Sequence, residues 1–102
     1  MVEIKTIHIQ GNSFIGILLK LPKNMIYMIT STRCILAGEQ FDINYFNRVK
    51  KQSRIVLVED CDDFENLLTS RVVKISDAAK ALGVQEGMSG EAALVILNEN
   101  QQ

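Results

Sequence analysis

The sequence has little of the residues on which catalytic, metal and disulfide sites depend. Its one histidine, His8, excludes a metal site built from two histidines. Two cysteines, Cys34 and Cys61, are too few for a disulfide framework, and we interpret both as free thiols of a cytoplasmic protein. No apolar run approaches the roughly 20 residues that span a bilayer, so we expect no membrane partner. The first residues also predict no signal peptide.

Tryptophan is absent, and Pro22 is the only proline. There is no repeat or low-complexity stretch, and nothing in the sequence resembles a linker. Apolar residues make up 47% of the 102 residues and charged residues 23%, a balance that supports one hydrophobic core and excludes disorder. We therefore expect a single domain over residues 1–102.

Acidic side chains are scarce in the first half of the chain, and basic side chains are scarce in the second. Residues 1–58 hold 8 basic and 3 acidic side chains, a net charge of +5, and residues 59–102 hold 3 basic and 9 acidic ones, a net charge of −6. The two halves sum to −1. Such asymmetry is typical of nucleic-acid or membrane contacts, of tails, or of oppositely charged patches that orient protein association.

The first third of the chain has the pattern of an antiparallel meander. Isoleucine and valine number 20 in the whole chain, and β-branched residues favour strands. Residues 10–12 and 22–24 carry the residues of tight turns. The predicted strands are residues 2–9, 13–21, 25–30 and 34–37. The second is apolar on both faces, which favours a place inside the sheet.

The apolar spacing changes near Asp42, which can cap a helix with Ile43, Phe46 and Val49 on one face. A strand at residues 54–58 follows. Strand, helix and strand over residues 34–58 are long enough for a β-α-β crossover with parallel strands.

The second half predicts shorter elements. Asp62 with Glu65 three residues later matches a helix-capping pattern. A strand at 71–75 precedes a helix at 78–82, capped by Ser76 or Asp77 and ended by Gly83. Ser89 caps a last helix at 90–98, with Ala93, Leu94 and Leu97 facing inward. The fold class is α+β: a single compact domain with an N-terminal, mainly antiparallel sheet and helices packed on it.

The acidic run at residues 59–65 is the densest charge feature. Carboxylates at a helix start satisfy free N–H groups and the helix dipole, and no EF-hand spacing is present, so we expect no metal ion. Cys61 lies inside this run, where the carboxylates oppose ionisation of its thiol. Cys34 follows Arg33 and is interpreted as a half-buried structural thiol.

Three glycines and a serine lie between the last two helices. The backbone amides of Gly87, Ser89 and Gly90 could bind an anion. However, Glu86 and Glu91 flank this segment and no P-loop lysine follows it, so we expect no cofactor. The segment from Ala78 also begins like a helix-turn-helix, yet the last helix carries no cation. A tight corner between helices, with Met88 filling a gap, is the simpler interpretation.

A basic cluster of Arg48, Lys50, Lys51 and Arg54 could bind phosphate, with Lys20 and Lys23 joining it if the fold brings them near. Four cations at a helix end are more often a solvated surface that matches the dipole.

The segment from Ala81 to Leu94 reads Ala-Leu-Gly-Val-x-x-Gly-Met-Ser-Gly-x-x-Ala-Leu. It resembles the C-terminal motif of the YunC-like family, small bacterial and archaeal proteins regarded as a domain of unknown function. Further matches are residues 21–23 and Gly38 followed by Asp42, Ile43 and Asn47. The resemblance spans essentially the whole chain and implies a compact α+β domain with no activity to carry over. Relatives often have a cysteine where this chain has Ala37, so cysteine chemistry at that position is not implied here.

Three functions remain as hypotheses. The leading one is a non-enzymatic domain that associates with itself, as a homo-oligomer, or with a protein partner, because a small chain with opposite charge patches gains from association. The alternative is a small enzyme or ligand-binding protein with a site near Gly38, Asp42, Gly87, Met88, Ser89 and Gly90. The third is a nucleic-acid binder that uses the basic half, which the acidic second half makes unlikely.

Overall fold

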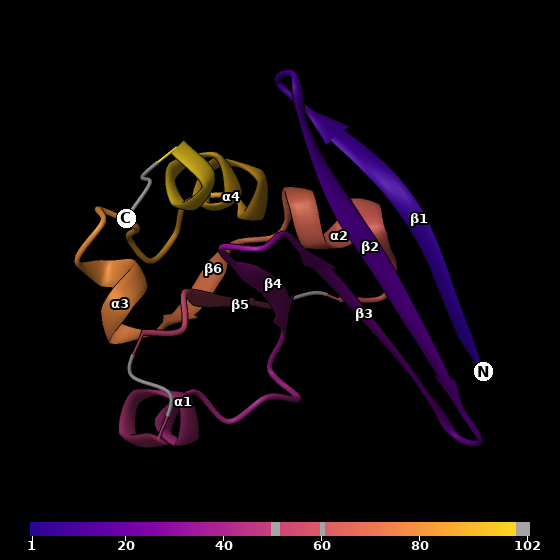
Figure 1. Cartoon of the computed structure of the whole chain (residues 1–102). Helices are drawn as coiled ribbons and strands as arrows, with labels where there is room; N and C mark the ends of the chain where they lie inside the picture. The colour runs from indigo at the N-terminus through magenta and orange to yellow at the C-terminus, as the bar shows by residue number, and fades with distance from the viewer. Residues whose placement is uncertain (50–51, 60, 100–102) are drawn as a thin grey trace.

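The computed structural model describes residues 1–49, 52–59 and 61–99. Within them, six strands form one sheet whose spatial order follows the chain (Figure 1). The strands are β1 (Val2–Ile9), β2 (Asn12–Leu21), β3 (Asn24–Thr30), β4 (Ile35–Gly38), β5 (Ile55–Val58) and β6 (Val72–Ile75). The helices are α1 (Ile43–Val49), α2 (Phe64–Thr69), α3 (Asp77–Lys80) and α4 (Gly90–Glu99). The predicted α+β class is confirmed.

Strands β1 to β4 are the predicted meander, each antiparallel to the next. Gln10 and Gly11 both have positive φ, 49° and 83°, which is the backbone of a two-residue hairpin turn whose twist suits the flanking strands. Strand β2 is paired on both sides, as its apolar sequence predicts.

The predicted crossover is present between β4 and β5, which are parallel and are connected through α1. Ile35 lies opposite Ile55, and the Ile35 N–H donates to the Arg54 carbonyl oxygen at 2.9 Å. The N-terminal ends of β4 and β5 therefore lie side by side, and so do their C-terminal ends, where Gly38 lies opposite Val58.

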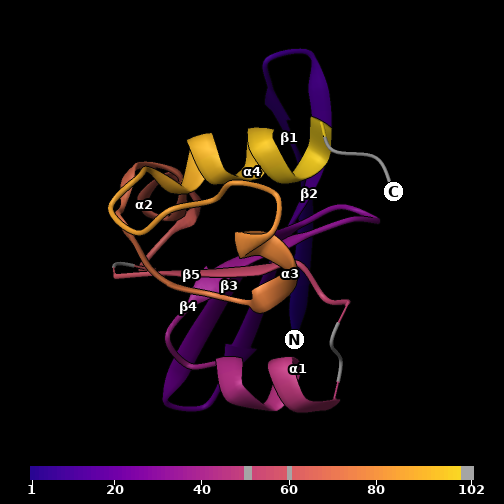
Figure 2. The same ribbon diagram turned by 90° about the vertical axis from the view of Figure 1, so that its left-hand side faces the viewer.

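The sheet has a helical layer on each side (Figure 2). Helix α1 covers one face, where Ile43 and Phe46 pack against Ala37, Ile55 and Leu57. Helices α2 and α4 cover the other face, where the larger core lies. There Leu67, Ala93, Leu94 and Leu97 are fully buried, so the predicted inward face of the last helix is confirmed.

The start of α2 corrects the sequence interpretation, and the start of α3 decides between the two predicted caps. The cap of α2 is Asp63, whose carboxylate accepts the Asn66 N–H at 2.7 Å, so the prediction that Asp62 begins the helix was wrong by one residue. Ser76 rather than Asp77 caps α3, and that helix spans only Asp77–Lys80. Gly83 has φ of 105°, the left-handed conformation expected after a helix.

Helix α1 begins after Asp42, as predicted, but its apolar face is shorter than the sequence suggested. Ile43 and Phe46 pack on the sheet, whereas Val49 is 50% exposed. Lys50 and Lys51, two members of the predicted basic cluster, lie outside the described residues.

Candidate functional site

Gly38 ends β4 against the side chain of Cys61. A Cβ atom at this position would overlap the Cys61 sulfur and come within 2.5 Å of the Gln40 amide oxygen. The Gln40 amide nitrogen lies 3.4 Å from the same sulfur. Glycine is therefore needed here because the thiol fills the space that a side chain would occupy.

Asp42 has a structural role at the start of α1. Its carboxylate accepts the Asn44 N–H at 2.9 Å, which satisfies one of the free donors of the first helical turn. Asn47, on the same helix, accepts the Asp77 N–H through its side-chain oxygen at 2.8 Å and so connects α1 to the start of α3.

The loop that contains Gly87, Met88, Ser89 and Gly90 extends the sheet beyond β6. Gly87 donates to the Val72 carbonyl at 2.9 Å, and Val72 donates to the Met88 carbonyl at 2.8 Å. The Ser89 hydroxyl oxygen accepts the Ala92 N–H at 3.1 Å, as predicted for a cap. A Cβ atom on Gly90 would overlap the Leu67 carbonyl oxygen, so this glycine allows α4 to approach α2.

The six predicted site residues thus lie at one end of the sheet, spread over three strand-to-strand steps and over both of its faces. Gly38 pairs with Val58, Val58 with Val72, and Val72 bonds Met88, which is a row of three strand-to-strand steps. At about 4.8 Å a step, Gly38 and Met88 are roughly 14 Å apart. Asp42 begins the helix on one face, and Gly90 begins the helix on the other.

A hollow of about 530 Å³ opens at the opposite end, beside the N-terminal ends of β4 and β5. We call it the polar hollow. Most of its described lining residues have polar side chains, and they come from two segments: Thr30, Ser31, Thr32, Arg33, Cys34, Ile35, Gln52, Ser53 and Arg54.

Two arginines of the polar hollow bind the end of α4. Arg33 donates to the Asn98 carbonyl at 3.2 Å, and Arg54 donates to the Leu97 carbonyl at 3.1 Å. These carbonyls belong to the last turn of the helix, where no later N–H is available within it. Both guanidinium groups are thereby held at one edge of the polar hollow.

The Cys34 thiol lies within this charged environment but is buried. Burial raises the pKa of Cys34 above its ordinary value, because it penalises the thiolate. The Ser31 hydroxyl, 3.4 Å from the sulfur, lowers that pKa, and so do the positive charges of Arg54 and Arg33, but the loss of solvation is the larger effect. Cys34 is therefore a neutral thiol at physiological pH, as expected for a structural cysteine.

Sequence reasoning missed the polar hollow because its two segments are about twenty residues apart. The available signal was a repeated pattern: Ser31-Thr32-Arg33 precedes β4, and Gln52-Ser53-Arg54 precedes β5. Because neighbouring parallel strands begin at the same edge of a sheet, two polar segments that precede them come together.

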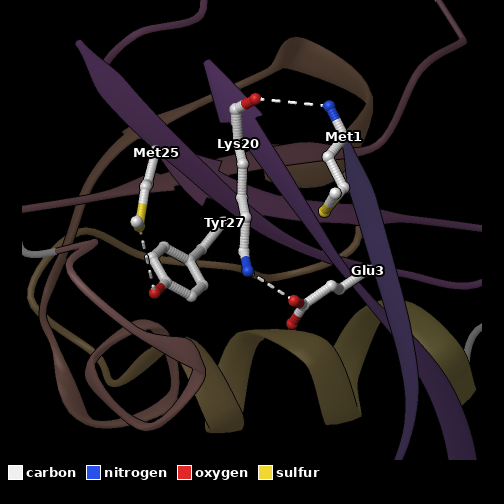
Figure 3. A network of polar contacts seen from close by, with 5 residues as sticks. All are labelled: Met1, Glu3, Lys20, Met25 and Tyr27. Carbon is white, nitrogen blue, oxygen red and sulfur yellow. Dashed lines mark hydrogen bonds and ion pairs between the residues drawn. The ribbon is translucent and has the colours of Figure 1, made fainter. Parts of the chain in front are cut away.

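A second hollow, of about 440 Å³, lies beside the turn between β2 and β3, and Pro22, Lys23, Tyr27 and Asp62 are among its lining residues. On this side of the strands Lys20 forms an ion pair with Glu3, and the Tyr27 hydroxyl approaches the Met25 sulfur at 4.0 Å (Figure 3). The Tyr27 ring also packs edge-on against Phe64 of α2, with ring centroids 5.1 Å apart.

The other face of β1, β2 and β3 is apolar and extends beyond α1. Cross-strand pairs place Ile4, Ile17 and Met28 in one row, on the same face of the sheet as α1. Met28, at one end of this row, packs with the residues that α1 covers. Figure 1 shows β1 and β2 projecting away from α1. We call the apolar residues of this region the open face: Val2, Ile4, Ile15, Ile17, Leu19, Leu21 and Ile26.

The side of β1, β2 and β3 that bears the open face has no aspartate, glutamate, lysine or arginine at any strand position. The charged residues of these three strands are Glu3, Lys5 and Lys20, and the register places all of them on the side of α2. The remaining polar positions of the open side are Thr6, in the middle of β1, and His8, Ser13, Asn24 and Thr30 nearer the strand ends, with His8 beside Ser13 at the hairpin turn. Yet Ile4 is 69% exposed, and Val2, Ile15 and Leu21 are about half exposed.

The described residues, all but 50–51, 60 and 100–102, contain no group of three or more histidine, cysteine, aspartate or glutamate side chains able to hold a metal ion. The polar neighbours of the two thiols in the structure are Ser31 and Gln40. No helix among these residues is long and apolar enough to cross a membrane.

A six-stranded, mostly antiparallel sheet between two helical layers defines the chain as a small α+β domain of a kind already observed. It is similar to a crystal structure of a protein of unknown function, TA1206 from Thermoplasma acidophilum, with a TM-score of 0.85 and 20% identity over 95% of this chain and 93% of that one. At that identity the similarity shows the fold.

The sequence comparisons give the family. Residues 40–97, more than half of the chain, match the domain of unknown function DUF1805, so the chain belongs to that family. It is also 28% identical to the uncharacterized protein YunC of Bacillus subtilis (strain 168) over 97 residues, which cover 93% of this chain and 96% of YunC. The resemblance to the YunC-like family is therefore confirmed.

Proposed function

We propose that the chain is a non-enzymatic, self-associating domain in which a second copy covers the open face. The observation that carries this proposal is the absence of charge from the exposed apolar side of β1, β2 and β3. A sheet face that stays in water carries polar side chains at alternate positions. Here Glu3, Lys5 and Lys20 occupy the helix side instead.

The size of the open face supports an interface. Strands about 4.8 Å apart with about 3.3 Å per residue give three strands of some eight residues a footprint of roughly 14 by 27 Å, or roughly 400 Å². Patches of this size on monomers are often functional, and a standard interface uses about 800 Å² per partner. The side chains project from the flat footprint and so add surface area, and the residues around the open face add more, which can bring the buried area closer to this value.

A second copy is the occupant that the charge pattern favours. In a two-fold contact each residue meets the same surface on its partner, so any charge on the face would meet a like charge nearby. An uncharged face avoids this repulsion. Two such sheets can pack face to face about 10 Å apart, with interdigitating apolar side chains.

Free cysteines and the absence of a membrane-crossing helix among the described residues are compatible with a cytoplasmic location.

The test compares matched substitutions on the two sides of the same strands. Ile4→Lys introduces a charge at the most exposed position of the open face, whereas Met25→Lys introduces one on the helix side at a residue that is 52% exposed. We expect Ile4→Lys to raise the dimer dissociation constant about 100-fold or more, since an unpaired charge is costly to bury, and Met25→Lys to leave it within about threefold. Equal effects of the two variants would refute the open face as the interface.

A further inference from the structure

We propose that the polar hollow binds the phosphate group of a small, non-aromatic molecule. The proposal concerns the hollow at the N-terminal ends of β4 and β5 and is independent of self-association through the open face. Four observations lead to it: the charge of the lining, the fixed position of its guanidinium groups, its hydroxyl and amide donors, and its size.

The charge of the lining is positive. Among the residues that the structure describes, it includes Arg33 and Arg54 and no carboxylate. The end of α4 contributes a partial negative charge, about half an elementary charge for a helix C-terminus. Arg33 and Arg54 each carry a full positive charge, so the described part of the lining favours an anion.

The arginines are held in position before any ligand arrives. Each donates to a carbonyl of the last turn of α4, which fixes long side chains that would otherwise lose conformational freedom on binding. The bond from Arg33 to Asn98 uses one of the five N–H donors of its guanidinium group. Guanidinium donors match the oxygens of a phosphate in geometry as well as in charge.

Hydroxyl and amide groups complete the set of donors. Ser31, Thr32 and Ser53 supply hydroxyl groups, and Gln52 supplies an amide. The hydroxyl of Thr30 is used differently, because it donates to the Cys34 carbonyl at 2.9 Å and thereby shapes the turn that carries Arg33. A phosphate has several oxygen acceptors, which suits a lining whose described residues are rich in donors and include no acidic side chain.

Size and composition narrow the ligand class. A volume of about 530 Å³ lies in the range of small-molecule sites and exceeds what a lone phosphate needs. The described lining residues include no aromatic ring on which a nucleobase could stack, so the remaining space suits a polar, aliphatic group rather than a nucleotide. Small phosphorylated polyols have this chemistry, with hydroxyl groups for the serine, threonine and glutamine side chains.

The experiment titrates the whole chain with inorganic phosphate and, separately, with glycerol 3-phosphate at constant ionic strength. The amide NMR spectrum is recorded at each step of the titration. We expect saturable shifts confined to residues 30–35 and 52–54, with glycerol 3-phosphate binding more tightly than phosphate. Arg33→Gln should weaken binding at least tenfold, whereas Arg48→Gln, outside the hollow, should leave it unchanged. Sodium chloride serves as the control for general salt effects.

Shifts that do not saturate, that sodium chloride reproduces, or that occur mainly outside the two segments would overturn the proposal. If Arg33→Gln fails to fold, Thr32→Val replaces it, because Thr32 is exposed and donates no structural hydrogen bond given by the described structure. Unchanged affinity in the folded variant would also overturn it.

Discussion

The Ser76 hydroxyl oxygen accepts the backbone N–H of Ile55 at 3.0 Å, inside the core and across 21 residues. The same hydroxyl donates to the Ser53 carbonyl at 2.8 Å and caps α3 through the Ala79 N–H. One buried side chain thus connects the start of β5, the segment before it and the first turn of α3. Its position also fixes the backbone on one side of the polar hollow.

Replacing this hydroxyl should therefore cost more than removing an ordinary cap. We expect Ser76→Ala to lower the free energy of unfolding by about 2–3 kcal/mol, since it leaves the buried Ile55 N–H without its acceptor. Ser89→Ala removes only the cap of α4 and should cost about 1 kcal/mol. Urea denaturation measures both, and equal costs would show that the Ile55 contact contributes little.

Gly90 is expected to be the glycine most sensitive to substitution in the last loop. Gly90→Ala places a methyl group into the Leu67 carbonyl oxygen and should destabilise the fold by about 1–3 kcal/mol through overpacking of α4 on α2. Gly87→Ala meets nothing within 4 Å and should cost about 1 kcal/mol through its positive φ alone. Thermal denaturation of the pair decides, and a larger loss for Gly87→Ala would refute the close approach of the helices.

The buried thiol of Cys34 predicts a specific dependence of stability on pH. Its pKa is raised in the folded state, so above the ordinary thiol pKa of about 8.5 the unfolded chain loses the proton first. Stability is therefore unaffected by this group at lower pH and falls as the pH rises through that window, by at most about 1.4 kcal/mol per pH unit.

Comparison with Cys34→Ala isolates this effect from other groups that titrate at high pH. The wild-type protein should lose stability more steeply than the variant above about pH 8.5. Parallel curves would mean that burial of the thiol does not disfavour its ionisation. The half-buried Cys61 should also react with a thiol reagent faster than Cys34 at neutral pH.

The outer edge of β1 offers a different mode of association, which a proline can separate from face-to-face packing. Met1 and Lys20 exchange backbone hydrogen bonds. In an antiparallel pair every second residue forms such bonds, so the odd-numbered residues of β1 are the ones bonded to β2. The N–H of Thr6, an even-numbered residue, therefore points away from β2. Thr6→Pro should therefore block edge pairing while leaving the hairpin intact. We expect this variant to associate as the wild type does; loss of association in a folded Thr6→Pro protein would favour the edge instead.

The sequence predicted the strands to within one residue at each end, because alternation and turn residues act locally. Gln10 and Gly11 adopt the positive φ values that a tight hairpin needs, and the segment between β4 and β5 is long enough for the parallel pairing that is observed. The cap of α2 was missed by one residue, since adjacent Asp62 and Asp63 have equal capping chemistry and only tertiary packing selects between them.

The sites were less predictable for a physical reason. The polar hollow joins residues before β4 to residues before β5, and the open face joins three strands, so both depend on which segments become neighbours. The apolar sequence of β2 correctly predicted pairing on both sides. It could not show that only one of its faces, that of Phe14 and Leu18, is buried by helices while Ile15 remains half exposed.

The most direct test of the account is the molar mass of the wild-type protein by sedimentation equilibrium between about 1 and 100 μM. A covered open face predicts a mass that rises with concentration towards about 23 kDa, twice the 11.4 kDa of one chain. A mass of 11.4 kDa throughout this range would contradict self-association and leave the open face without its proposed partner.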